Sequence, residues 1–474
     1  MFIRDANRTA NATSHFTSCG LGYPLPARNV VLAACRMSQP TPSVLVFSGI
    51  RAIDPGRNLD SLVDVVVERG VITKVGPKAG DAARKAEGCR VVDGKGKWLL
   101  SAFIDLHAHL REPGQEYKED IATGLAAAAA GGFARVCAMP NTRPVNDTRA
   151  ITEMMVARAA EVGGTRLHPI GAITMGQKGE ELTEMGDLRD AGAVAVSDDG
   201  HCVMSASVMR RALEYARTFD LCVIQHAEDH TLTQGAQMHE GVVSARLGLR
   251  GWPREAEDII VARDVMLAEL TGARYHVAHV SSMGAVRILR DAKARGIAVT
   301  AEATPHHLVF TDEAVIGYRT ECKVNPPLRS QQDVNALRAA LADGTIDCVA
   351  TDHAPHSPLE KDCEFQEAAT GMIGLETCLA LLLGLVRSGA LPLARVVDAL
   401  TAAPARVLGL EKPSLAEGAR ADLVVVAPER RWTVTAEKLR SKSKNTPLLG
   451  QELTGAVDLT LVGGKIVFER QEDG

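Results

Sequence analysis

The chain has little of what marks disulfide-rich, membrane-spanning or nucleic-acid-binding proteins. Its 10 cysteines are scattered singly and no Cys-x-x-Cys pair occurs, which excludes a zinc ribbon or a disulfide framework and favours a reducing cytoplasm. No apolar run approaches the length needed to cross a bilayer. The net charge is −5 and the basic residues form no stripe with interleaved aromatics, so we expect neither a nucleic acid nor a membrane as partner.

The two ends of the chain share a strand-rich texture that the middle lacks. From 43 to 97, and again from 410 to 474, short β-branched runs alternate with Gly, Pro and Asp turns. We therefore expect the N- and C-terminal segments to meet as one small β-sandwich domain. Residues 1–42 carry no helical or strand periodicity, and we expect them to be a leader that is disordered or lies upstream of the natural start.

The body from 98 to 409 alternates β-like runs with helical patterns, such as 117–130 and 206–218, the latter with Ser205 as a candidate cap. Eight strands alternating with helices are typical of an α/β fold of the (β/α)8 TIM-type barrel. The runs lie at 99–109, 135–141, 167–173, 193–199, 221–227, 274–279, 298–304 and 348–352.

His107 and His109 stand near the end of the first of these runs. Side chains two residues apart on a strand point to the same face, so the two imidazoles can close on one ion. A borderline Lewis acid such as Zn²⁺ suits two neutral imidazoles. A His-x-His pair alone is weak support for a metal site.

Polar residues at the ends of other runs strengthen this interpretation. Taken singly, each is equally well explained as a hydrogen-bonded buried group or a helix cap. Barrel enzymes, however, carry their chemistry at the carboxyl ends of the strands, which share one rim. On the sixth run His276 and His279 are three residues apart, so we expect only His279, at the end, to point inward. The strand-end residues are His107, His109, Asp198, Asp199, His226, His279 and Asp352.

Seven motifs along the chain resemble those of class I dihydroorotases of the amidohydrolase superfamily, and they follow one another in the same order as in that family. The resemblance runs from about Val44 to the C-terminus, and together the motifs are highly specific. They occupy 105–114, 139–142, 197–200, 323–329, 351–356, 374–377 and 441–447.

The resemblance implies a centre with one or two Zn²⁺ ions. Many amidohydrolases bridge two metals with a carboxylated lysine on the fourth strand, but 193–200 contains no lysine, so a carboxylate must serve. The family's spacing favours Asp199 over Asp198, and only one of two adjacent residues is expected to face the metal. The implied ligands are His107, His109, Asp199, His226, His279 and Asp352.

The resemblance also implies the reaction, a reversible interconversion of L-dihydroorotate and N-carbamoyl-L-aspartate in pyrimidine biosynthesis. Metal-bound hydroxide would attack the ring amide, and Asp352 would also shuttle the proton to the leaving nitrogen. Arg111 offers a planar fork for the substrate carboxylate. Asn141 and His356 are similar to the family's other carboxylate contacts, and Asn325 to its contact with the pyrimidine ring. A homo-oligomer is expected, and aspartate transcarbamoylase is a possible partner.

Two departures and two alternatives accompany this interpretation. Ser101-Ala102 replaces a usual Pro-Gly, which changes backbone freedom and not chemistry. The segment 368–371 replaces a Pro-Phe-Gly-like loop over the substrate, and an altered substrate affinity is the expected consequence. A hydantoinase-like cyclic amidase is the first alternative, although the missing lysine and Arg111 argue against it. The second is a non-catalytic dihydroorotase-like scaffold subunit, which the complete ligand set disfavours.

Overall fold

The computed structural model describes residues 43–471. The leader predicted for 1–42 lies outside these residues. Within 43–471, no helix combines the length and the apolar character that a membrane span requires.

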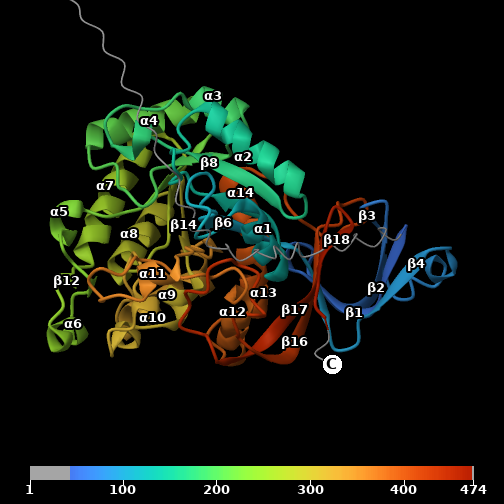
Figure 1. The fold of residues 1–474 in the computed structure, drawn as a ribbon. Helices are drawn as coiled ribbons and strands as arrows, with labels where there is room; N and C mark the ends of the chain where they lie inside the picture. The colour runs from blue at the N-terminus through green and yellow to red at the C-terminus, as the bar shows by residue number, and fades with distance from the viewer. Residues whose placement is uncertain (1–42, 472–474) are drawn as a thin grey trace, which may run out of the picture. The chain divides into compact units, whose positions relative to one another are not determined.

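Eight parallel strands form a barrel with helices around it (Figure 1). Their order around the sheet follows the order along the chain. A parallel bridge between Ala108 and His353 joins the first strand to the segment that follows the last. Inside the barrel, apolar residues such as Leu106 and Ile224 pack with Val407 of the helix Ala402–Leu408 (α14). The strands are β6 (Phe103–Ala108), β7 (Phe133–Ala138), β8 (Arg166–Gly171), β9 (Ala195–Ser197), β10 (Cys222–Gln225), β13 (Tyr275–Val277), β14 (Val299–Ala303) and β15 (Cys348–Val349).

Helices connect the strands, as the alternating patterns predict. Ser205 caps α4 by accepting a hydrogen bond from the amide of Val208. The helix α1 begins at Ile121, later than the pattern suggests, because Asp120 accepts from the amide of Thr123 and caps it there. The main helices are α1 (Ile121–Ala130), α2 (Arg149–Val162), α3 (Met185–Asp190), α4 (Ala206–Thr218), α7 (Glu255–Thr271), α8 (Met283–Ala294), α10 (Gln331–Asp343), α12 (Cys378–Arg387) and α13 (Leu393–Leu400).

Shorter elements line the loops beyond the strand ends. The segment after β10 contains α5 and α6 and the small two-stranded sheet of β11 and β12. They are α5 (His230–Thr233), β11 (Met238–His239), α6 (Val242–Leu247), β12 (Gly251–Trp252), α9 (Pro305–Val309) and α11 (Pro358–Lys361), with 3-10 turns at Pro55–Arg57, Ala83–Lys85, Met175–Gln177, Asp312–Val315 and Thr320–Cys322.

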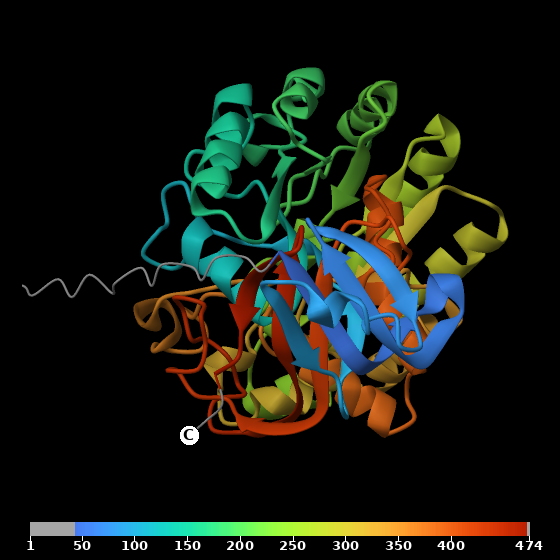
Figure 2. The same cartoon turned by 90° about the vertical axis from the view of Figure 1, so that its right-hand side faces the viewer.

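The two ends of the chain meet in one mixed sheet, and Figure 2 shows their strands side by side. The hydrogen bonds run continuously through it in the order β18-β17-β16-β5-β1-β2-β3, and β4 pairs with β1. Phe47, Val65 and Leu461 belong to a shared core, so the sheet encloses its own apolar side chains. Its strands are β1 (Val44–Asp54), β2 (Leu59–Glu68), β3 (Val71–Gly76), β4 (Cys89–Asp93), β5 (Trp98–Ser101), β16 (Leu423–Thr433), β17 (Glu452–Val462) and β18 (Lys465–Glu469).

The run 99–109, expected as one strand, is divided between the two sheets. β5 pairs with β1 and β16 in the terminal sheet, whereas β6 opens the barrel at Phe103. The apolar residues of both halves are buried, which explains why the sequence pattern shows no break between them.

Candidate metal centre

The predicted ligands come together at the carboxyl ends of the barrel strands. His107 lies in β6 and His109 directly follows it, while the others follow β9, β10, β13 and β15. All are buried, with exposed fractions of 6% or less. The six residues are His107, His109, Asp199, His226, His279 and Asp352.

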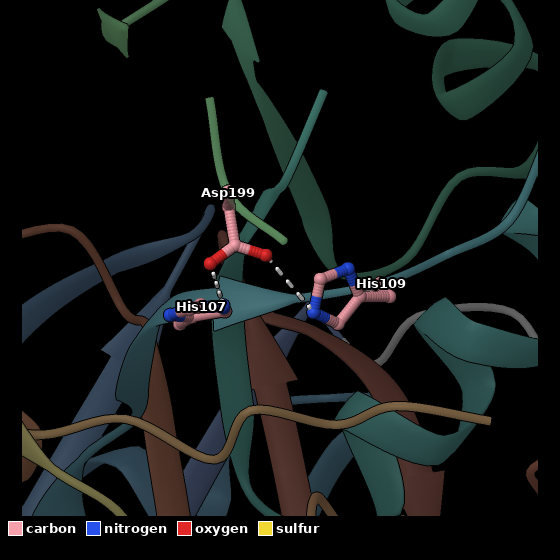
Figure 3. Close-up of side chains that lie close together, drawn as sticks. All are labelled: His107, His109 and Asp199. Carbon is pink, nitrogen blue, oxygen red and sulfur yellow. Dashed lines mark ion pairs between the residues drawn. The ribbon is translucent and has the colours of Figure 1, made fainter. Parts of the chain in front are cut away.

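The carboxylate of Asp199 points toward both His107 and His109 (Figure 3). Its Oδ1 is 3.3 Å from His107 Nε2, and its Oδ2 is 3.5 Å from His109 Nε2. Oδ1 is also 3.6 Å from His226 Nδ1 and 3.5 Å from His279 Nε2. One carboxylate therefore faces two separate pairs of imidazoles, as a bridging ligand between two ions would.

Asp352 lies beside His107 and His109. Its Oδ1 is 3.1 Å from His109 Nε2 and 3.5 Å from His107 Nε2. Two sets of potential ligands thus share Asp199: one with His107 and His109, the other with His226 and His279. Asp352 adjoins the first set.

The residues present fit a metal ion. His107 Nε2 and Asp199 Oδ1 are buried and have no hydrogen-bond partner within residues 43–471, although such atoms are normally paired. Imidazole nitrogens with carboxylate oxygens form the donor set that Zn²⁺ accepts. A cation between these atoms would supply the missing partners.

The electrostatics of the group also fit a cation. Burial lowers the pKa of His226, but Asp199 and Glu228 outweigh it and raise the pKa to about 10. Burial raises the pKa of Asp352, yet His107 and His109 hold that pKa below its usual range. The carboxylates thus draw positive charge to His226, and a divalent ion would supply that charge while releasing the proton.

Three of the histidines are oriented by an oxygen behind them. His107 Nδ1 lies 2.8 Å from Glu302 Oε1, His109 Nδ1 2.8 Å from Asn141 Oδ1, and His226 Nε2 3.1 Å from Glu228 Oε2. Because these oxygens accept, each ring donates on that side, and its other nitrogen faces the centre, where it can bind a metal ion.

Sequence reasoning missed the roles of Glu302 and Glu228. A signal was present for both. Glu302 is the one charged residue of the buried strand β14, and Glu228 follows His226 by two residues at a strand end. A buried carboxylate requires a hydrogen-bond donor or a positive charge beside it, so both positions indicate a partner at the strand ends.

Asp198 and Asp199 point in different directions. Asp198 Oδ1 accepts from the amides of Ile173 and Thr174, at 2.8 and 3.0 Å. Burial raises the pKa of Asp198 to about 6. These bonds tie the end of β9 to the loop after β8, and the next residue, Asp199, then faces the histidines.

The expectation that only His279 of its strand points inward was wrong. His276 Nε2 is 3.2 Å from Glu302 Oε2, so His276 reaches the carboxylate that also holds His107. The strand β13 ends at Val277, and His279 has a left-handed φ of 31°. The alternation of faces does not extend past the end of the strand. His276 is also bonded to Thr300 and therefore needs no metal.

Arg111 and His356 form a pair beside the metal ligands. Arg111 is buried, donates from Nε to Pro355 O, and places Nη2 3.4 Å from His356 Nε2. Burial lowers the pKa of Arg111 to about 10, and burial next to Arg111 lowers that of His356 to about 3. The neutral His356 donates to Thr370 O, in the segment 368–371 that departs from the family pattern.

The two predicted asparagines lie close to the candidate ligands. Asn141 accepts from His109, as described above. Asn325 donates from Nδ2 to Glu228 Oε2 at 3.1 Å. Asn141 is thus bonded to a candidate ligand directly, and Asn325 is linked to His226 through Glu228.

Three site residues have backbone conformations that non-glycine residues rarely adopt. Arg111, His279 and Asp352 have φ values of 62°, 31° and 45°. Such conformations cost roughly 1–3 kcal/mol each and cluster at functional sites. They turn these side chains inward just after strands end.

Comparisons with known proteins agree with this geometry. The Dihydro-orotase-like family matches residues 96–285, and the Amidohydrolase family matches 261–468. The dihydroorotase of Anaeromyxobacter dehalogenans is 54% identical over 431 residues, which cover 90% of this chain and 99% of that protein. That of Geobacter metallireducens is 50% identical over 426 residues, covering 90% and 100%.

Solved structures with the same fold include hydantoinases. The L-hydantoinase of Arthrobacter aurescens is superimposed with a TM-score of 0.80 at 24% identity, covering 90% of this chain and 96% of that one. The dihydropyrimidinase of Brevibacillus agri has a TM-score of 0.76 at 21% identity, with coverage of 90% and 95%. At this identity the likeness bears on the fold alone.

Proposed function

The chain belongs to the dihydroorotase family of the amidohydrolases, and on that premise we propose that it interconverts L-dihydroorotate and N-carbamoyl-L-aspartate. It is a cyclic amide hydrolase whose substrate is a small molecule. The observation that carries the proposal is the position of Asp199, shared by two pairs of imidazoles, with the buried Arg111 near them.

The family and the ligand clusters indicate a metal cofactor, and we propose Zn²⁺, one or two per chain. His107, His109, Asp199 and Asp352 would hold one ion, and Asp199, His226 and His279 a second. When bound, the metal acts as a Lewis acid and makes water a stronger nucleophile at neutral pH.

Asp352 is the proposed proton shuttle. Its pKa is held below its usual range by the neighbouring histidines, which outweigh the effect of burial, so the carboxylate is ionised at neutral pH and can accept a proton. It would take the proton of the attacking water and pass it to the ring nitrogen as the amide bond breaks. In the synthetic direction the same carboxylate takes the proton from the carbamoyl nitrogen.

Arg111 is the proposed anchor of the substrate carboxylate. A buried guanidinium without a carboxylate in hydrogen-bond contact is costly. Among the described residues, the hydrogen-bond contacts of Arg111 are the carbonyl of Pro355 and the ring of His356, and neither carries a negative charge. An anionic ligand would restore the missing charge, and the planar fork suits a carboxylate. Asn141 and His356 would complete the contact, and Asn325 would hold the ring.

A hydantoinase activity fits less well. Neither β9 nor the residues that follow it supply a lysine, and Asp199 stands among the histidines instead. A substrate without a carboxylate would also leave Arg111 without an anionic hydrogen-bond partner. The scaffold alternative does not explain why all six ligand positions are occupied and converge.

Further proposals concern the setting of the enzyme. We propose two domains: a β-sandwich formed by 43–97 together with 410–474, and a barrel formed by 98–409. The strand β5 is assigned to the β-sandwich, because it pairs with β16. We propose a cytoplasmic location, since the described cysteines are free thiols. A homo-oligomer and an association with aspartate transcarbamoylase are tested by sizing the protein with and without that partner.

The test of the activity is hydrolysis of L-dihydroorotate by the purified full chain with zinc, before and after chelation. We expect turnover that chelation abolishes and zinc restores, and none from Asp352→Ala with its metal content intact. If the metal-loaded protein shows no turnover, alone or with a transcarbamoylase, the dihydroorotase proposal is refuted.

A further inference from the structure

Glu228 is a buried carboxylate to which the mechanism above assigns no step. Its two oxygens serve different neighbours. Oε2 lies 3.1 Å from Asn325 Nδ2 and 3.1 Å from His226 Nε2. Oε1 lies 3.1 Å from His230 Nδ1 and accepts from the hydroxyl of Thr233. One oxygen therefore faces the site, and the other faces α5.

We propose that Glu228 fixes the amide of Asn325 so that Asn325 Oδ1 is presented to the substrate as a hydrogen-bond acceptor for a ring N–H. Glu228 is then a positioning residue that sets specificity through Asn325. The inference rests on the proposed function, because it deepens how the same site recognises its cyclic substrate.

The chemistry of the contact determines the orientation of the amide. A carboxylate oxygen only accepts hydrogen bonds, so the NH₂ group of Asn325 must face Glu228. The amide oxygen must then point away from Glu228. Within residues 43–471, Asn325 Oδ1 is buried and has no hydrogen-bond partner. The backbone next to Asn325 is also fixed, because His307 Nε2 donates to the carbonyl of Pro326.

A buried acceptor without a partner selects for ligands that donate. The rings of dihydroorotate and related cyclic amides offer both carbonyl oxygens and N–H groups. Asn325 Oδ1 is matched by an N–H and repelled by a carbonyl oxygen or a methylated nitrogen. Sites that hydrogen-bond a substrate N–H reject analogues that lack it, because the site's own polar group is left unpaired.

The same carboxylate accepts from His226, whose Nδ1 faces Asp199. Glu228 therefore links the orientation of a candidate metal ligand to that of a candidate substrate contact. The two roles are separable, because loss of the first changes metal content, whereas loss of the second changes substrate affinity.

The experiment compares Glu228→Gln with Thr233→Val in the zinc-loaded full chain. Glutamine keeps the shape but has one acceptor, so it cannot accept from both sides, and the amide of Asn325 can turn its NH₂ toward the substrate. The assay contains excess zinc, so that a weaker hold on His226 does not lower the zinc content of the variant. Under this condition we expect the KM for dihydroorotate to rise about 10- to 100-fold, with a smaller change in kcat. Thr233→Val removes a bond on Oε1 only, and its KM should stay within about twofold.

A double-mutant cycle shows whether Glu228 acts through Asn325. In an Asn325→Ala background, Glu228→Gln should raise KM by no more than about twofold. An unchanged KM in the single variant, or an equal rise in both backgrounds, overturns the inference. If the wild-type protein does not turn over dihydroorotate at all, the proposed function itself has failed, and the inference fails with it.

A measurement that needs no change at Glu228 covers the case in which Glu228→Gln does not fold or loses zinc. The 1-methyl and 3-methyl derivatives of dihydroorotate are tested as competitive inhibitors of the wild-type protein and of Asn325→Ala. We expect one of them to bind the wild type about tenfold or more weakly than the unmethylated ring, and this penalty to shrink in Asn325→Ala. If neither penalty depends on Asn325, the inference is overturned.

Discussion

Replacing Glu302 by glutamine is expected to weaken metal binding, although Glu302 is not itself one of the proposed ligands. Glu302 is fully buried in β14 and accepts from two histidines: His107 Nδ1 at 2.8 Å and His276 Nε2 at 3.2 Å. Burial raises its pKa, but the two imidazoles outweigh this and hold the pKa at about 2. Glutamine retains one accepting oxygen, so one imidazole would face an NH₂ group instead.

The magnitude follows from the number of bonds lost. One hydrogen bond to a charged acceptor contributes about 1.5–3 kcal/mol, which corresponds to a factor of roughly 10 to 150 in a binding constant. Without the carboxylate, His107 is also free to carry its proton on Nε2, the atom that faces Asp199. We therefore expect the zinc dissociation constant to rise about 10- to 100-fold, the range seen when partners behind a ligand are removed.

The assay is competition for zinc against a chromophoric chelator, with the free energy of unfolding measured alongside. Thr300→Val is the matched control, because it removes the bond to His276 Nδ1 on the side away from His107. It should cost stability of about 1 kcal/mol but leave the zinc affinity within about twofold. Unchanged zinc affinity in Glu302→Gln would refute the reasoning, as would an equal loss in the control.

Three further predictions concern the substrate side and stability. Arg111→Lys keeps a positive charge but loses the planar fork, so the KM for dihydroorotate should rise about tenfold or more in steady-state kinetics. An unchanged KM would show that Arg111 does not bind the carboxylate. Asn445 accepts from the amide of His356 and donates to the carbonyls of Ala354 and Gly371, so Asn445→Ala should raise KM more than it lowers kcat and should lower unfolding stability by about 1–3 kcal/mol. The pKa of Glu376 is raised to about 7 by burial, and a carboxyl group whose folded-state pKa is raised loses stability as pH increases from its unfolded value to about 7. Glu376→Gln should therefore be more stable than the wild type at pH 8, by about 1–3 kcal/mol, and close to it at pH 4.5; denaturant unfolding at both values tests this, and a difference independent of pH contradicts it.

Much of the architecture could be predicted from local pattern. The eight barrel strands were each visible as a short apolar run, because a buried parallel strand is apolar on both faces. His107 and His109 were recognisable as a pair because the two-residue period of a strand is a local property. The rim position of the other candidate ligands followed from chain order alone, since successive parallel strands end on the same side.

The structure decided what depends on pairing between distant segments. Leu99 and Phe103 belong to different sheets, although the apolar run does not separate them, because β5 finds its partners in β16 and β1. Asp198 turns from the centre because it accepts a hydrogen bond from the amide of Thr174 in the neighbouring loop. His276 joins the interior because Glu302 extends toward it.

The orientation of the histidines was also beyond the reach of sequence reasoning. His107 and Glu302 are 195 positions apart, and Asn325 and Glu228 are 97 apart. Residue types and their spacing along one strand determined which groups could bind a metal and a carboxylate, because both depend on local geometry. Which nitrogen of each imidazole, and which end of the Asn325 amide, faces the site was decided only by tertiary structure, because a hydrogen bond requires its donor and acceptor to meet in space.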